Sequence, residues 1–149
     1  MYHTILVPLD GSKRAEAILR PVEELAQCSH AKIIFLQIVP PESIVVWHNG
    51  VYPEYDQQKL EQRIREAESD LATRQGEFRE KGIEAHTYVV HGPIVEAIIN
   101  IAEREGADLI AIAGHAWTDQ SQVFYGSVAA GLLQHLDQPL LFIRSLNEE

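Results

Sequence analysis

Short apolar runs alternate along the chain with longer segments in which apolar residues recur at helical spacing. Strands are predicted for the apolar runs, which span residues 3–9, 31–39, 83–91, 107–113 and 140–144. Amphipathic helices are predicted between them, at residues 12–29, 57–81, 93–105 and 127–136. Such alternation is typical of a parallel sheet whose crossover helices cover both faces. The pattern therefore predicts one doubly wound, three-layer α/β domain that spans residues 1–149.

Turn residues mark the ends of several predicted elements. Gly82 and Gly106 follow predicted helices at the C-terminal capping position. Pro93 stands in the first turn of a helix, where its missing N–H costs nothing. After the first strand, Asp10-Gly11-Ser12 predicts a tight turn, and Ser12 can cap the helix that follows.

Residues 40–56 show no regular pattern and are predicted to form a loop. They hold three of the seven prolines together with Trp47, His48, Tyr52 and Tyr55. A loop of this length in a small domain is usually a lid, a binding loop or a disordered segment. The aromatic residues favour an ordered role, in which Trp47 and Tyr52 either close over a ligand or, more commonly, anchor the loop by packing.

The charge of the chain excludes several classes of partner. There are 12 Lys and Arg residues against 22 Asp and Glu residues, which gives a formal charge of −10 at pH 7. Binding to a nucleic-acid backbone needs clustered basic residues, and the chain has no basic run. The apolar runs are shorter than the roughly 18 residues of a membrane helix, and no secretion signal is recognisable. We therefore expect a cytoplasmic protein that binds neither nucleic acid nor membrane.

Three segments are candidates for a ligand site, because ligands of open α/β sheets bind beyond the carboxyl ends of the strands. They are residues 8–12, the chain from Val39 onward, and residues 113–127. Asp10 can cap a helix, which is the commoner role, or meet a ribose hydroxyl or a metal ion. Gly126-Ser127-Val128 opens the predicted last helix, where free amide groups bind anions.

The sequence resembles the universal stress proteins over nearly its whole length, apart from residues 40–57. The resemblance is carried by TILVPLDGS at the start, by Gly92-Pro93 with the following IVEAIINIAEREGADLIAIAGH, and by YGSVAAGLLQHLDQPLLFIR at the end. It implies a five-stranded parallel sheet in the order 3-2-1-4-5 and a homodimer paired along the last strand. Many members bind ATP or AMP, with no reaction beyond weak hydrolysis.

The nucleotide-binding members carry Gly-x-x-Gly, nine residues, and then Gly-Ser or Gly-Thr. Here the spacing to Gly126 is kept, but Ala113 and Ala116 replace both loop glycines. Ala113 ends a strand, where alanine fits, whereas Ala116 weakens binding about tenfold if the loop needs positive φ there. His115 stands between the two and either reaches the phosphate or, more commonly for a loop histidine, is solvated.

The resemblance assigns adenine to the backbone near Val39, ribose and adenine to Asp10, and phosphates to Gly126, Ser127 and Val128. The full set of candidate binding residues is Pro8, Leu9, Asp10, Val39, Gly114, His115, Ala116, Gly126, Ser127 and Val128. Residues 117–122 contain no Lys or Arg, and Asp119 adds negative charge. This composition favours AMP, or ATP accompanied by a metal ion such as Mg²⁺, over a bare triphosphate.

Enzyme motifs are absent from the sequence. It has no phosphate-binding loop of the Gly-x-x-x-x-Gly-Lys type, no nucleophile elbow and no paired histidines at zinc-ligand spacing. The leading hypothesis is therefore a homodimeric universal stress protein that binds an adenine nucleotide as a regulatory ligand, with weak ATP hydrolysis at most. The alternative is a member that has lost nucleotide binding and acts as a dimeric protein-interaction module.

Overall fold

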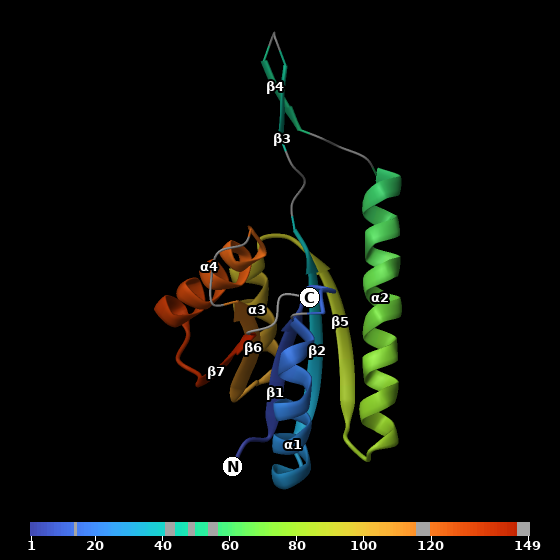
Figure 1. The fold of residues 1–149 in the computed structure, drawn as a ribbon, viewed down its shortest axis with the longest axis vertical. Coiled ribbons are helices and arrows are strands. Elements are labelled where there is room, and N and C mark those ends of the chain that lie inside the picture. Colours follow the sequence, from blue (N-terminus) through green and yellow to red (C-terminus); the bar gives the residue numbers. More distant parts are fainter. Residues whose placement is uncertain (14, 41–43, 48–49, 54–56, 116–119, 146–149) are drawn as a thin grey trace.

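The computed structural model describes residues 1–13, 15–40, 44–47, 50–53, 57–115 and 120–145, with side chains described for 1–13, 15–40, 57–114 and 128–144. Five parallel strands form one sheet, in the order β5-β2-β1-β6-β7 (Figure 1). They are β1 (Thr4–Leu9), β2 (Lys32–Val39), β5 (Ala85–His91), β6 (Leu109–His115) and β7 (Leu140–Ser145). Counted along the sheet strands alone this order is 3-2-1-4-5, so the predicted fold class is confirmed.

Helices cover both faces of this sheet. They are α1 (Leu19–Ser29), α2 (Gln57–Glu80), α3 (Ile94–Glu105) and α4 (Gln120–His135), with the 3-10 helix η1 (Ala15–Ile18) before α1. The crossovers through α1 and α2 run along the sheet in one direction, and those through α3 and α4 run in the other. Right-handed crossovers in opposite directions place their helices on opposite faces. Accordingly α2 packs on β2 and β5, while α3 packs against α4.

The core lies where the central strands meet the helices. Every residue of β1 is buried, as expected for the middle strand of a covered parallel sheet. From α2, only Ala67, Leu71 and Phe78 are buried. The Phe78 ring meets the Phe35 ring of β2 edge-to-face, with 5.0 Å between ring centroids. These contacts fix the distance of α2 from the sheet and therefore shape the space between them.

The entry to α1 differs from the single helix predicted for 12–29. The turn ends with Ser12, whose Oγ accepts a hydrogen bond from the Ala15 N–H at 3.1 Å, so the predicted cap is present. A 3-10 turn follows, and the α-helix begins only at Leu19. Pro21 explains the late start, because proline fits the first turn of an α-helix but breaks its interior.

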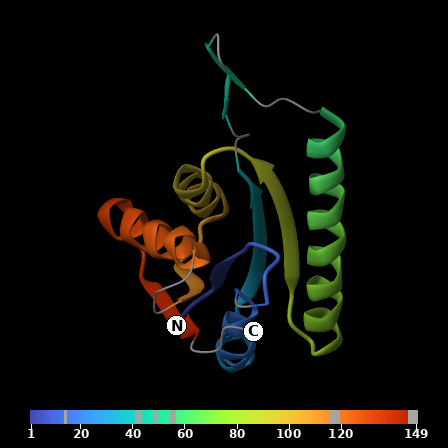
Figure 2. The same cartoon turned by 45° about the horizontal axis from the view of Figure 1, so that its top comes forward.

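Residues 44–47 and 50–53 correct the prediction of a loop. They form β3 (Ile44–Trp47) and β4 (Gly50–Pro53), an antiparallel pair in which Ile44 faces Pro53. The pair stands beyond the carboxyl end of β2, away from the five-stranded sheet, in both ribbon views (Figures 1 and 2). The sequence carried a signal that the prediction overlooked, since only two residues separate the paired Trp47 and Gly50, and two residues are the commonest length of a hairpin connection.

Two boundaries near the predicted ligand site also differ. β6 runs on to His115, two residues beyond the predicted end, and pairs with β7 over that length. α4 begins at Gln120 instead of about Ser127, so Gly126 and Ser127 lie in its second turn. Because free amides belong to the first turn of a helix, this start changes which N–H groups can meet an anion.

Candidate functional site

The site begins where β1 stops pairing with β6. β1 pairs with β2 as far as Leu9, but with β6 only over Ile5 and Leu6. The Thr4 carbonyl accepts a hydrogen bond from Asp108 N–H on the β6 side, so alternate residues, including Pro8, also face β6. Proline has no N–H to donate to that ladder. The early end of the pairing falls where the strand order reverses, which is the usual ligand position in such sheets.

Asp10 shapes the turn that leaves β1. Its Oδ1 accepts hydrogen bonds from the Ser12 N–H at 2.9 Å and from the Ser12 Oγ at 2.6 Å. Asp10 therefore forms a local turn with Ser12, and it is Ser12, not Asp10, that caps the helix. Oδ2 has no hydrogen-bond partner among the described residues, which leaves one carboxylate oxygen available to a ligand.

A cavity of about 650 Å³ opens beside this turn, between the carboxyl ends of β1 and β2 and the first half of α2. The volume lies within the range of small-molecule sites. Its lining residues come from three elements and the chain that follows them: Asp10, Gly11, Gln37, Ile38, Val39, Pro40, Arg63, Glu66, Ala67 and Asp70. Of the predicted binding residues, the structure thus brings Asp10 and Val39 together.

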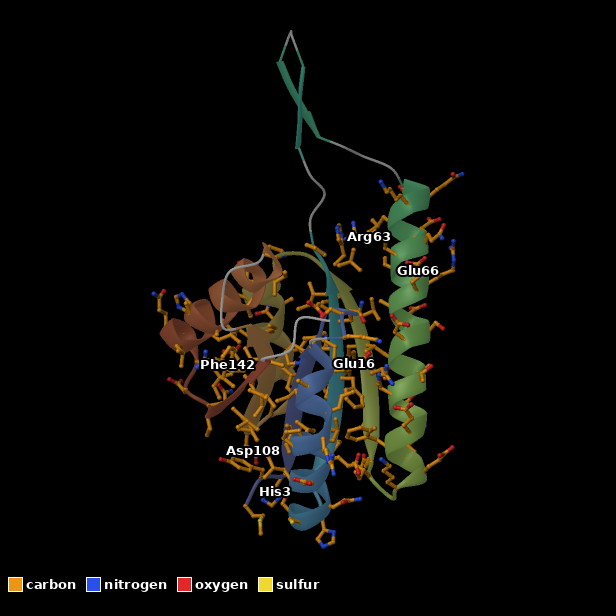
Figure 3. The ribbon with its side chains drawn as sticks, in the orientation of Figure 1. His3, Glu16, Arg63, Glu66, Asp108 and Phe142 are labelled. Carbon is orange, nitrogen blue, oxygen red and sulfur yellow. The ribbon has the colours of Figure 1, made fainter. Side chains whose placement is uncertain are left out.

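The charged lining of the cavity is acidic. In the described part of the chain, Asp10, Glu66 and Asp70 contribute three carboxylates to the lining, and Arg63 contributes its one cation. Arg63 and Glu66 extend from α2 near the carboxyl end of β2 (Figure 3). A phosphate inside this cavity would face more negative than positive charge, whereas an uncharged base or sugar carries no such cost.

Gln37 and Gly11 line the cavity next to each other. Gly11 has φ +85°, a conformation that favours glycine, whereas a Cβ there would lie 3.3 Å from Gln37 Nε2, which a small shift of that side chain relieves. Gln37 Oε1 is buried without a hydrogen-bond partner among the described residues. A smaller cavity of about 80 Å³ shares Gln37 with the large one, is also lined by Glu16 and Arg74, and is large enough for ordered water.

Ion pairs hold α2 beside the turn. Arg74 reaches Glu16 of η1 at 2.8 Å and Glu77 of its own helix at 3.0 Å. Burial alone would lower the pKa of Arg74, but hydrogen bonds and attraction from Glu77 and Glu16 outweigh it and raise that pKa. The guanidinium therefore stays charged and links the helix wall of the site to the β1 turn.

The backbone polar groups at the end of β2 point alternately towards β5 and towards β1. The Val39 carbonyl already accepts a hydrogen bond from the Gly92 N–H at 3.0 Å, on the β5 side. Since successive strand residues turn their polar groups to opposite sides, those of Ile38 face β1, which ends at Leu9. Ile38 is therefore better placed than Val39 for the backbone contact with a base that the resemblance implied.

Most other predicted residues do not line this cavity. Pro8 and Leu9 are buried in β1, Gly114 pairs with Arg144 inside β6, and Val128 is 4% exposed in the core. Gly126 and Ser127 belong to α4, with side chains outside the described set, as is that of His115. Ala116 lies outside the described residues altogether. No group of three or more His, Cys, Asp or Glu residues in the described part is arranged to hold a metal ion.

Six lining residues were missed by sequence reasoning: Gln37, Ile38, Arg63, Glu66, Ala67 and Asp70. The three charged residues on α2 lie in a stretch that mixes acidic and basic residues, a pattern typical of a solvated helix face. The sequence does contain a signal for them, given by their spacing from the buried Ala67. Arg63 precedes Ala67 by four residues, Glu66 precedes it by one, and Asp70 follows it by three. Those spacings put Arg63 and Asp70 on the helix face of Ala67, with Glu66 next to it in the chain.

Comparison with known proteins places the chain among relatives of the same length. The sequence model of the universal stress protein family matches residues 1–144. Universal stress protein MJ0577 of Methanocaldococcus jannaschii is 25% identical over 158 aligned positions, covering 99% of this chain and 98% of that protein. No described helix is long and apolar enough to cross a bilayer.

Solved structures agree with this relationship. A universal stress family protein from Burkholderia pseudomallei has a TM-score of 0.72 and 28% identity, over 95% of this chain and 96% of that one. A universal stress protein in complex with cAMP has a TM-score of 0.62 at 22% identity, with 97% of this chain and 98% of that chain covered. The Archaeoglobus fulgidus protein in complex with dAMP has a TM-score of 0.67 at 20% identity, over 95% and 98%. The last two likenesses show the shared fold.

Proposed function

The chain belongs to the universal stress protein family, and on that premise we propose that it binds an adenine nucleotide, AMP or ATP, as a regulatory ligand. The observation that carries the proposal is the cavity of about 650 Å³ beside Asp10 and Ile38, at the carboxyl end of the sheet. Two proteins of the same fold were solved with cAMP and with dAMP. Both ligands contain adenine, ribose or deoxyribose, and one phosphate.

The proposed pose follows from the chemistry of each wall. The base lies against Ile38, Val39 and Pro40, because this part of the lining is apolar. The ribose hydroxyls donate to Oδ2 of Asp10, the oxygen that Ser12 does not use. The phosphate points away from the acidic wall of α2, towards the amino-terminal end of α4, where amides and the helix dipole favour an anion.

The position of the phosphate depends on where α4 starts. With α4 beginning at Gln120, the amides of Gly126, Ser127 and Val128 lie beyond the first turn, where N–H groups bond within the helix. Phosphate contacts at these three residues therefore require the first turns of α4 to open in the complex. Faster hydrogen exchange at residues 120–125 on addition of AMP is the corresponding observable.

AMP is expected to bind more tightly than ATP. The described lining of the cavity has three carboxylates against one guanidinium, and residues 117–122 contain no Lys or Arg in the sequence. Two further phosphates add negative charge that these groups do not neutralise. Mg²⁺ bound to the nucleotide reduces this repulsion, so it should make the affinities for AMP and ATP more similar.

The test is calorimetric titration of the purified protein, stripped of bound nucleotide by unfolding and refolding, with AMP, ATP and ATP plus Mg²⁺. The ultraviolet spectrum of the released fraction shows whether a nucleotide was carried through purification. We expect saturable binding with AMP ahead of ATP. ATP binding much more tightly than AMP without Mg²⁺ would contradict the charge argument, and absence of binding by all three would contradict the function.

The alternative function is a dimeric interaction module without a nucleotide, and the dimer that both functions share is supported by a different observation. Leu133 of α4 is 69% exposed and Phe142 of the edge strand β7 is 36% exposed. An exposed apolar side chain on an edge strand, with another on a helix of the same chain, is typical of an interface. We propose that two copies pair along β7, which light scattering tests, and this pairing is compatible with either function.

A further inference from the structure

Among the residues that the structure describes, Arg63 is the one cation in the lining of the large cavity. It lies in the second turn of α2, with Glu66 three residues further along and with Asp10 and Asp70 in the same lining. Among the described residues it nevertheless forms no ion pair. A guanidinium held near three carboxylates but bonded to none of them is free to contact a ligand.

The opposite wall decides what kind of ligand group Arg63 meets. It is the apolar end of β2, made by Ile38, Val39 and Pro40. A guanidinium is planar and weakly hydrated, so it stacks on flat aromatic groups as well as pairing with anions. An apolar surface facing a planar cation suits a flat heterocycle between them. A phosphate in the same place would lie beside Glu66 and Asp70, which disfavours it.

We propose that Arg63 is a binding residue for the base: its guanidinium stacks on the adenine ring and holds it against the end of β2. The inference rests on the proposed nucleotide-binding function and adds a contact from α2 to it. Stacking of a cation on a π-system contributes about three- to thirty-fold in affinity, depending on how far it is desolvated. Because Arg63 itself is exposed in the free protein, its removal should leave the fold intact.

The test compares Arg63→Ala with the wild type for two ligands that share the base but not the phosphate, adenosine and AMP. Stacking predicts that both affinities fall by the same factor. It also predicts an upfield shift of the Arg63 side-chain NMR resonances when adenosine binds, because of the ring current. Arg65→Ala is the matched control, since Arg65 is an exposed arginine on the same helix outside the cavity lining. It should change neither affinity.

Two outcomes would overturn the inference while leaving nucleotide binding intact. If Arg63→Ala weakens AMP but not adenosine, Arg63 attracts the phosphate and does not stack on the base. If it changes neither affinity, Arg63 makes no contact with the ligand. Failure of the wild-type protein to bind adenosine and AMP would overturn both this inference and the proposed function, so the two failures are distinguishable.

Discussion

Replacement of Asp10 by Asn or by Ala should separate its structural role from its role in binding. In the unsubstituted protein the two hydrogen bonds from Ser12 to Asp10 are 2.9 and 2.6 Å long. The side-chain oxygen of the Asp10→Asn variant can still accept both, so we expect a stability loss below about 0.5 kcal/mol. Asp10→Ala removes both bonds. In a half-buried turn this should cost about 1–2 kcal/mol, which corresponds to a Tm lower by roughly 2–8 °C.

Binding should respond differently. The side-chain NH₂ introduced by Asp10→Asn presents a donor where Oδ2 accepted ribose hydroxyls, so both variants should bind adenosine about tenfold more weakly. Adenosine is the right ligand, because it has no phosphate whose repulsion the lost charge would relieve. Urea unfolding and calorimetry give the two quantities, and Glu68→Gln, exposed on α2 outside the cavity, is the control. Equal stability losses in the Asn and Ala variants would rule out the structural role of Asp10, and unchanged adenosine affinity in both would rule out its contact with the ribose.

Three further predictions follow from particular residues. Ala116→Gly should tighten AMP binding about tenfold by calorimetry, whereas Ala113→Gly, at a buried position inside β6, should not. Asp108 accepts hydrogen bonds from the amides of His3 and Thr4, and these outweigh the effect of burial and lower the pKa of Asp108. The ionised carboxylate therefore stabilises the folded protein at pH values above its unfolded pKa near 4. This stabilisation is lost as the pH falls through the lower pKa of the folded state. Asp108→Ala should accordingly cost about 1–3 kcal/mol in urea unfolding at pH 7 and much less near pH 2. Phe142→Asp should yield monomers by light scattering if copies pair along β7.

The regular part of the fold was predictable because its signals are local. Gly82 and Gly106 cap α2 and α3 with φ of +80° and +68°, as their positions after two amphipathic patterns indicated. The start of α4 was not predictable in this way. Gly126-Ser127 matches a helix-start pattern, but the residues before it also form part of the helix. Where two local patterns overlap, the sequence leaves the boundary undetermined.

The site was predictable at the strand ends and not on the helix. Asp10 follows a buried strand in a family pattern, and its side chain lines the cavity. The part played by Arg63 and Glu66 depends on the separation of α2 from the sheet, which Phe78 and Phe35 set by their packing. That separation is a tertiary quantity, so a pattern of charges along α2 does not contain it.

Binding of AMP in the large cavity is tested most directly by an NMR titration of the uniformly labelled protein, in which the amide shifts locate the ligand. We expect the largest shifts at Gly11, Ile38 and the first half of α2. Another cavity, of about 400 Å³, lies elsewhere and is lined by His30, Lys81 and neighbours at the ends of α1 and α2. Shifts confined to that cavity, or no shifts at saturating AMP, would show that AMP does not bind in the large cavity.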